Sequence, residues 1–221
     1  MAPEIAELFP VSFEDSTLGP IPKGWKAGAV MDICSQTGNG GTPRRDNPEY
    51  WEPASVPWLT SGEVRQSIIT STDSAISESG LQHSAAKLWP ASTTIVALYG
   101  ATAGQSTLSA IELSANQACC GLQPKSGFRA FLYLYVSSST ERLEQQARGS
   151  AQQNLSKKIV EDLSIILPDD IIASHFDSFV EPLFSHWIAL LNESQQLAGT
   201  RDKLLLHLLS GELPVAGEAA R

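Results

Sequence analysis

The chain has 221 residues, of which 42% are hydrophobic and 18% charged, and its formal net charge is −9. This length and hydrophobic content are sufficient for a packed core, and the low charged fraction argues against a disordered chain. Taken whole, the negative charge argues against nucleic-acid binding.

The charge is unevenly distributed, however. Residues 1–20 contain four acids and no base, residues 21–168 contain twelve of each, and residues 169–221 contain eight acids and three bases. The neutral central region can therefore carry a local basic face. The N-terminus lacks the basic and apolar regions of a signal peptide, and no apolar run is long enough to span a membrane, so we expect a cytoplasmic protein.

The first two thirds of the chain predict an α+β domain. Residues 1–20 are expected to form a flexible lead-in, and residues 21–168 a globular domain of short strands and helices. The β-branched run at 93–100 and the apolar run at 162–168 predict buried strands. Helical spacing followed by glycine predicts a helix over 128–149. Cys34, Cys119 and Cys120 lack metal-ligand spacing and are expected to be buried thiols.

Residues 169–211 predict one long helix, after which 212–221 form a disordered tail. Apolar residues recur in alternating steps of three and four, which is typical of a coiled-coil seam that meets a partner helix. Ser194 and Arg201 interrupt the seam, and Pro182 is expected to kink the helix. The alternative is an amphipathic helix packed on its own domain. The apolar seam residues are Phe176, Val180, Leu183, Trp187, Leu190, Leu197, Leu204 and Leu208.

No catalytic constellation is evident, and we predict neither a bound cofactor nor a metal site. The four histidines lack ligand-spaced neighbours, and the segment GNGG leads into Thr42 and Pro43, which excludes a phosphate-binding loop that opens a helix. Several polar loops are instead suited to binding. Arginine can clamp a phosphate or read guanine, and Asn–Gln pairs suit adenine. Two lysines at the start of a short helix oppose its dipole and favour an anion nearby.

Taken in order, these segments resemble one known family. The strings LGPIPKGW, GGTPRRDNPEYW, VPWLTSGEV, ISESGLQHSAAKLWP, ALYGATAGQ, NQAC, GSAQQNLSKK and LSIILP, followed by a long helix, are similar to one target recognition domain and one conserved helix of type I restriction–modification specificity subunits. The resemblance runs from about Leu18 to Leu213. Because such a subunit normally has two of each, the chain is expected to be a half-subunit or a fragment.

The resemblance implies a non-catalytic reader of double-stranded DNA. Its helix docks methyltransferase subunits, which carry S-adenosylmethionine, and the restriction subunit joins that core. One recognition domain binds one half of a bipartite site, and two copies with antiparallel helices are expected to form a homodimer that reads a symmetric bipartite site. The residues expected to contact DNA are Thr42, Arg44, Arg45, Thr60, Ser61, Tyr99, Thr102, Gln105, Asn116, Gln117, Gln152, Asn154, Lys157 and Lys158.

Two alternatives remain open at this point. The chain could be a protein-interaction module that acts through its helical arm without binding specific DNA. It could also be an enzyme whose site is formed by Tyr99, Asn116 and Lys157. The steep salt dependence of phosphate contacts separates DNA binding from a protein interface.

Overall fold

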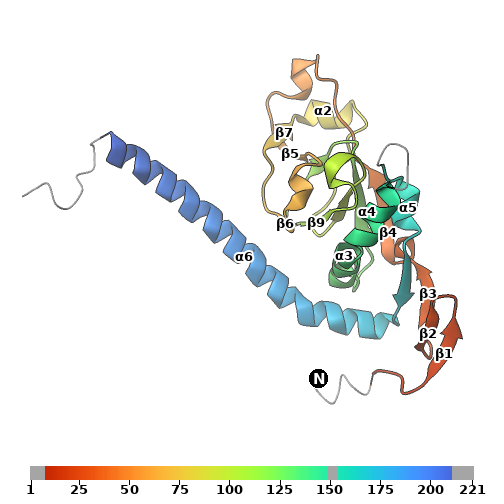
Figure 1. The fold of residues 1–221 in the computed structure, drawn as a ribbon. Helices are drawn as coiled ribbons and strands as arrows, with labels where there is room; N and C mark the ends of the chain where they lie inside the picture. Colours follow the sequence, from red (N-terminus) through yellow and green to blue (C-terminus); the bar gives the residue numbers. More distant parts are fainter. Residues whose placement is uncertain (1–7, 149–153, 211–221) are drawn as a thin grey trace, which may run out of the picture. The chain divides into compact units, whose positions relative to one another are not determined.

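A computed structural model describes residues 8–148 and 154–210. The fold is α+β with a long C-terminal helix, which confirms the predicted fold class (Figure 1). The chain forms two compact units, Met1–Glu181 and Pro182–Arg221. The boundary therefore lies inside the long helix, about a dozen residues after the position expected from the sequence.

A five-stranded sheet lies at the centre of the first unit. Its strand order is β4-β11-β8-β9-β6, in which only β6 and β9 run parallel. The predicted strand at 93–100 is confirmed as β8, whose four residues are all buried. The strands are β4 (Cys34–Asn39), β6 (Ile68–Ile69), β8 (Thr94–Ala97), β9 (Ser106–Ser109) and β11 (Cys119–Pro124).

A second sheet, of three strands, has the order β10-β5-β7, with β10 parallel to β5. Its strands are β5 (Val56–Leu59), β7 (Ser74–Ile76) and β10 (Ser114–Ala115). Short helices and helical turns lie between the strands. These are η1 (Val30–Ile33), η2 (Pro48–Tyr50), η3 (Glu63–Arg65), η4 (Gly100–Thr102), α2 (Glu78–Gln82) and α5 (Lys157–Glu161).

The expectation for residues 1–20 is wrong over part of that range. Strands β1 (Phe13–Ser16) and β2 (Gly19–Pro22) form an antiparallel hairpin, drawn in red in Figure 1. The tight turn is possible because Gly19 has a φ of +94°, which other residues rarely adopt. Next, β3 (Lys26–Ala29) pairs with β12 (Ser164–Leu167), which confirms the strand predicted at 162–168.

The predicted helix at 128–149 is two helices, α3 (Arg129–Ser138) and α4 (Thr140–Arg148). They meet at Ser139, whose hydroxyl donates to the carbonyl of Tyr135 at 2.9 Å. The hydroxyl of Thr140 likewise donates to the carbonyl of Ser137 at 2.8 Å. Such side-chain bonds compete with the helical backbone pattern, which explains a break inside an apolar periodicity that looks continuous.

Helix α6 (Asp170–Leu209) confirms the predicted long helix. The carboxylate of Asp169 accepts the backbone N–H of Ile172 at 2.9 Å, so Asp169 is the N-terminal cap. Pro182 lies inside the helix, and the kink expected there stays a prediction. No helix in the described residues is long and apolar enough to cross a membrane. The expected disordered tail at 212–221 lies outside the described residues.

Candidate nucleic-acid interface

Four of the predicted contact residues lie on loops that are bonded to one another. The hydroxyl of Thr42 donates to the side-chain oxygen of Gln117. The next residue, Ala118, accepts the backbone N–H of Leu98 at 2.7 Å, and the carbonyl of Leu98 accepts the N–H of Leu155 at 2.8 Å. Tyr99 and Asn154, one residue along, form a β-bridge. Thr42, Gln117, Tyr99 and Asn154 therefore share one continuous edge of the domain.

Three more predicted residues extend this edge at the carboxyl ends of β5 and β10. The backbone N–H of Asn116 donates to the carbonyl of Leu59 at 2.9 Å, which places Asn116 beside Thr60 and Ser61. The amide oxygen of Asn116 accepts the N–H of Ala118 at 3.1 Å, so part of this side chain stabilises its own turn. Thr60 donates its backbone N–H and its hydroxyl to Glu63, at 2.8 Å each.

Thr102 and Gln105 form the turn after β8. The N–H of Gln105 donates to the carbonyl of Thr102, and the N–H of Ala97 donates to the carbonyl of Gln105, at 2.9 Å each. Thr102 is only 5% exposed, so its selection as a contact residue does not fit this structure. Gln105 is partly exposed. Gln152, also selected from the sequence, lies outside the described residues.

The glycines before Thr42 make room for the chain itself. A Cβ atom at Gly40 would lie 2.3 Å from the carbonyl oxygens of Ala115 and Asn116, and one at Gly41 would lie 2.3 Å from the carbonyl carbon of Ala85. The indole N–H of Trp58 donates to the carbonyl of Gly41 at 3.1 Å. Neighbouring backbone therefore fills the space beside Gly40 and Gly41, which leaves no room there for a ligand.

The two arginines that follow have different surroundings. Arg44 forms a bidentate pair with Asp46, at 2.7 and 3.1 Å, and both side chains are mostly exposed. The bond to Arg44 lowers the pKa of Asp46. The guanidinium of Arg45 lies 4.1 Å from the ring centre of Trp51 and 5.3 Å from that of Trp58. Arg45 therefore holds the loop by a cation–π contact while remaining exposed at its surface.

The two lysines of α5 are explained by acids one turn later. Lys157 pairs with Glu161 at 2.5 Å and lies 3.4 Å from the hydroxyl of Thr37, and Lys158 pairs with Asp162 at 2.7 Å. Burial opposes the charge of Glu161, but the bonds from Lys157 and Thr37 outweigh it and lower the pKa of Glu161. The anions that these lysines favour are thus carboxylates of the protein itself, and such i,i+4 pairs stabilise the helix.

Two features near the interface were not selected from the sequence. Lys87 is exposed, and its ammonium group lies 3.3 Å from the position that a Cβ atom would take on Gly38. The rings of Tyr50 and His83 stack in parallel, with centroids 6.4 Å apart. Nothing local marks either feature, since both depend on contacts between segments more than thirty residues apart.

The seam of α6 is mostly exposed. The ring of Phe176 packs edge-on against Phe131 of α3, and Val180 is 9% exposed. Val180 is thus buried within the first unit, whereas Phe176 contacts Phe131 but stays 38% exposed. The remaining six, Leu183, Trp187, Leu190, Leu197, Leu204 and Leu208, are between 40% and 63% exposed.

The cysteines are buried, as predicted. Burial raises the pKa of the Cys34 and Cys120 thiols to about 12 and also raises that of Cys119, so these thiols stay protonated and unreactive. Within residues 8–148 and 154–210 no group of three histidine, cysteine, aspartate or glutamate side chains could hold a metal ion.

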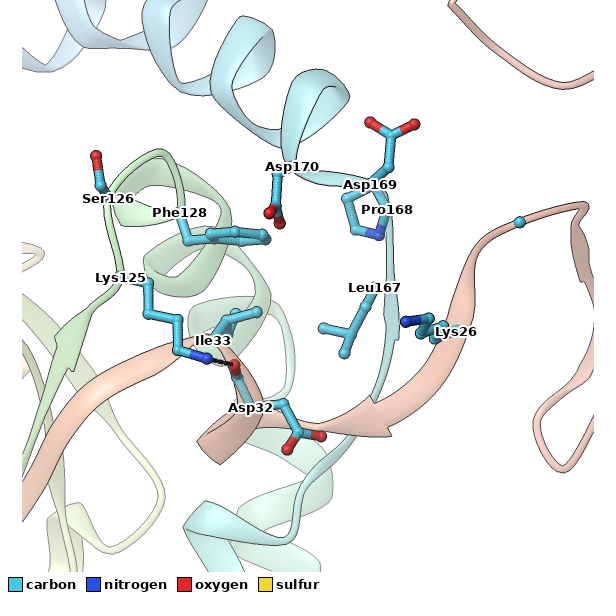
Figure 2. Close-up of a pocket in the computed structure, with 11 residues that line it drawn as sticks. Lys26, Asp32, Ile33, Lys125, Ser126, Phe128, Leu167, Pro168, Asp169 and Asp170 are labelled. Carbon is cyan, nitrogen blue, oxygen red and sulfur yellow. Dashed lines mark hydrogen bonds between the residues drawn. The ribbon is translucent and has the colours of Figure 1, made fainter.

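A cavity of about 580 Å3 lies apart from the predicted contact residues, none of which lines it (Figure 2). It opens between β3, η1 and the start of α6, and Phe128, Ile33 and Leu167 form its apolar wall. The ammonium group of Lys125 donates to the backbone carbonyl of Asp32 at 2.6 Å. The cavity is lined by charges of both signs, which are Lys26, Lys125, Asp32, Asp169 and Asp170.

Comparison with known proteins points to one family. A family model described as "Type I restriction modification DNA specificity domain" matches residues 22–190. The type I restriction enzyme MjaIX specificity subunit of Methanocaldococcus jannaschii is 23% identical over 207 residues, which are 92% of this chain and 48% of that protein. The EcoR124I/EcoR124II specificity subunit of Escherichia coli is 35% identical over 54 residues, or 24% of this chain and 13% of that protein.

Solved structures show the same fold. The HsdS subunit from Thermoanaerobacter tengcongensis superimposes with a TM-score of 0.56 and 17% identity, covering 86% of this chain and 44% of that one. The type I specificity subunit from M. genitalium gives a TM-score of 0.61 and 13% identity, covering 83% and 45%. The chain spans about half the length of the specificity subunit from M. jannaschii and of these solved structures.

Proposed function

Because the chain belongs to the type I restriction–modification DNA specificity domain family, we propose that it recognises one half of a bipartite DNA site without catalysing a reaction. The methyltransferase subunits, which carry S-adenosylmethionine, and through them the restriction subunit, are its proposed partners. The exposed part of the α6 seam is the proposed docking surface for helices of a partner or of a second copy.

One observation carries the DNA-binding proposal. Loops from four separate parts of the chain meet at one edge, where they present Thr42, Gln117, Tyr99 and Asn154. Hydroxyl and amide side chains can donate to and accept from base edges and phosphates. The backbone bonds between these loops fix their spacing, and a rigid constellation is what sequence readout requires.

The test is selection from random duplex DNA. The full chain, alone and mixed with the methyltransferase subunit from the same source, is incubated with a random-sequence duplex library, and the retained duplexes are sequenced. We expect one enriched motif. Gln117→Ala should relax the preference at a single base position, by about 1–3 kcal/mol, because the amide can no longer pair with a base edge.

Other results of this experiment would contradict sequence recognition or favour a protein-interaction module. Retention of duplexes without an enriched motif, or no retention at low salt, would contradict sequence recognition. Uptake of the methyltransferase subunit without DNA binding would then favour the protein-interaction module. If Gln117→Ala weakened every sequence equally, Gln117 would be a phosphate contact and not a base reader.

A further inference from the structure

Most cations at the proposed interface already have a partner. Arg44 pairs with Asp46, Lys157 with Glu161 and Lys158 with Asp162, while Arg45 is stacked on Trp51. An ion pair carries no net charge, so such a side chain must give up its carboxylate before it can neutralise a phosphate. The charges that sequence inspection would assign to DNA are therefore mostly used within the protein.

Lys87 is different. Its side chain is exposed, and its ammonium group forms no ion pair or hydrogen bond with any described residue. It follows the buried Ala86 and lies two residues before the buried Trp89, so buried side chains anchor the segment on both sides of it. Trp89 packs across Gly121, and Gly121 is the strand neighbour of Gly38 in the β4–β11 pair.

The position of Lys87 is set by two glycines. Gly41 lies against the backbone of Ala85 and Ala86, and Gly38 lies under the end of the Lys87 side chain. Segments 85–87 and 38–41 therefore run side by side in opposite directions. Thr42 follows Gly41 directly and bonds to Gln117, so the unpaired positive charge lies beside the segment that leads into the loop edge.

We propose that Lys87 contacts a backbone phosphate of the bound duplex and positions the polar loop edge over the bases. This inference rests on the proposed DNA-binding function. A phosphate contact carries no sequence information of its own, so Lys87 would contribute to affinity for every sequence and to the salt dependence of binding.

The test compares three variants of the full chain with the unmodified chain, using a random-sequence duplex as the probe. Affinity is measured between ~50 and ~200 mM salt, where phosphate contacts are most visible. For Lys87→Ala we expect the slope of log affinity against log salt to lose about one unit in magnitude, with a similar loss of affinity for every sequence. Lys87→Arg should keep the slope of the unmodified chain, because it keeps the charge.

Lys23→Ala is the matched control, since Lys23 is an exposed lysine beside the β1–β2 hairpin, outside the polar loops. Circular dichroism confirms that each variant folds. An unchanged slope for Lys87→Ala would overturn this inference and leave the DNA-binding proposal standing. Equal losses for Lys23→Ala and Lys87→Ala would show an effect of net charge and would also overturn it. No binding by the unmodified chain would overturn the DNA-binding proposal, and the role of Lys87 with it.

Discussion

At the scale of single residues, we expect Arg45 to stabilise the loop at 42–51 more than its neighbour Arg44 does. The guanidinium of Arg45 lies over two indole rings, and those rings meet edge to face with centroids 5.3 Å apart. Cation–π contacts at exposed sites contribute about 0.5–1 kcal/mol. We expect Arg45→Ala to lower the free energy of unfolding by this amount, measured by urea denaturation.

Arg44→Ala is the control for this prediction, because it removes the same charge from the same loop. Its pair with Asp46 is solvent-exposed, and exposed pairs add little to stability. Arg45→Lys should recover only part of the loss, since lysine lacks the planar group that stacks. Equal destabilisation by Arg44→Ala and Arg45→Ala would show that loop charge, and not the indole contact, matters.

At the scale of elements, Gly40 allows the strand β4 to pass close to the end of β10. A Cβ atom there would meet two carbonyl oxygens at 2.3 Å, and backbone cannot move aside as a flexible side chain can. We expect Gly40→Ala to destabilise the protein by at least ~1–3 kcal/mol, the usual cost of overpacking. Thermal unfolding followed by circular dichroism measures the loss.

Gly62→Ala is the matched change at an open position. The nearest atom to its added Cβ would be the hydroxyl oxygen of Thr60 at 3.9 Å, and its φ of −67° suits alanine. This variant should be neutral or slightly stabilising, because alanine restricts the unfolded chain. A loss of stability at Gly62 as large as that at Gly40 would contradict the steric explanation.

The elements also show what the sequence could predict. The local spacing of apolar residues indicates strand β8, strand β12 and helix α6, and all three were predicted. The hairpin at 13–22 was not, because proline and glycine in short strands resemble a turn. The pairs Lys157–Glu161 and Lys158–Asp162 were readable from their spacing of four.

The contact of Gly41 with Ala85, in contrast, joins segments far apart in sequence, and no local pattern indicates it. The same limit applies to the candidate site. Residue types indicated polar loops, but only the backbone bonds between Leu98, Ala118 and Leu155 show which loops are neighbours. The exposure of each side chain then shows that Gln117 is accessible to a ligand and that Thr102 is buried.

At the scale of the whole molecule, the apolar residues of α6 form an exposed seam. Leu183, Leu190 and Leu197 are each about half exposed or more, at the spacing of a two-helix seam. The segment 169–221, which contains α6, is acidic overall. Two copies would therefore repel each other by charge, and apolar contacts must stabilise their pairing. We propose that two copies pair through this seam, and we expect light scattering at tens of micromolar to give twice the chain mass of 23.7 kDa.

Leu197→Asp should shift the protein to the monomer, because it places a charge in the centre of the apolar seam. Gln196→Asp adds the same charge one residue away, off the seam, and should leave the dimer intact. Addition of the methyltransferase subunit then distinguishes the two uses of the arm. A dimer that takes up two such subunits supports pairing of copies. A monomeric unmodified chain that takes up one would assign the seam to the methyltransferase and exclude the homodimer.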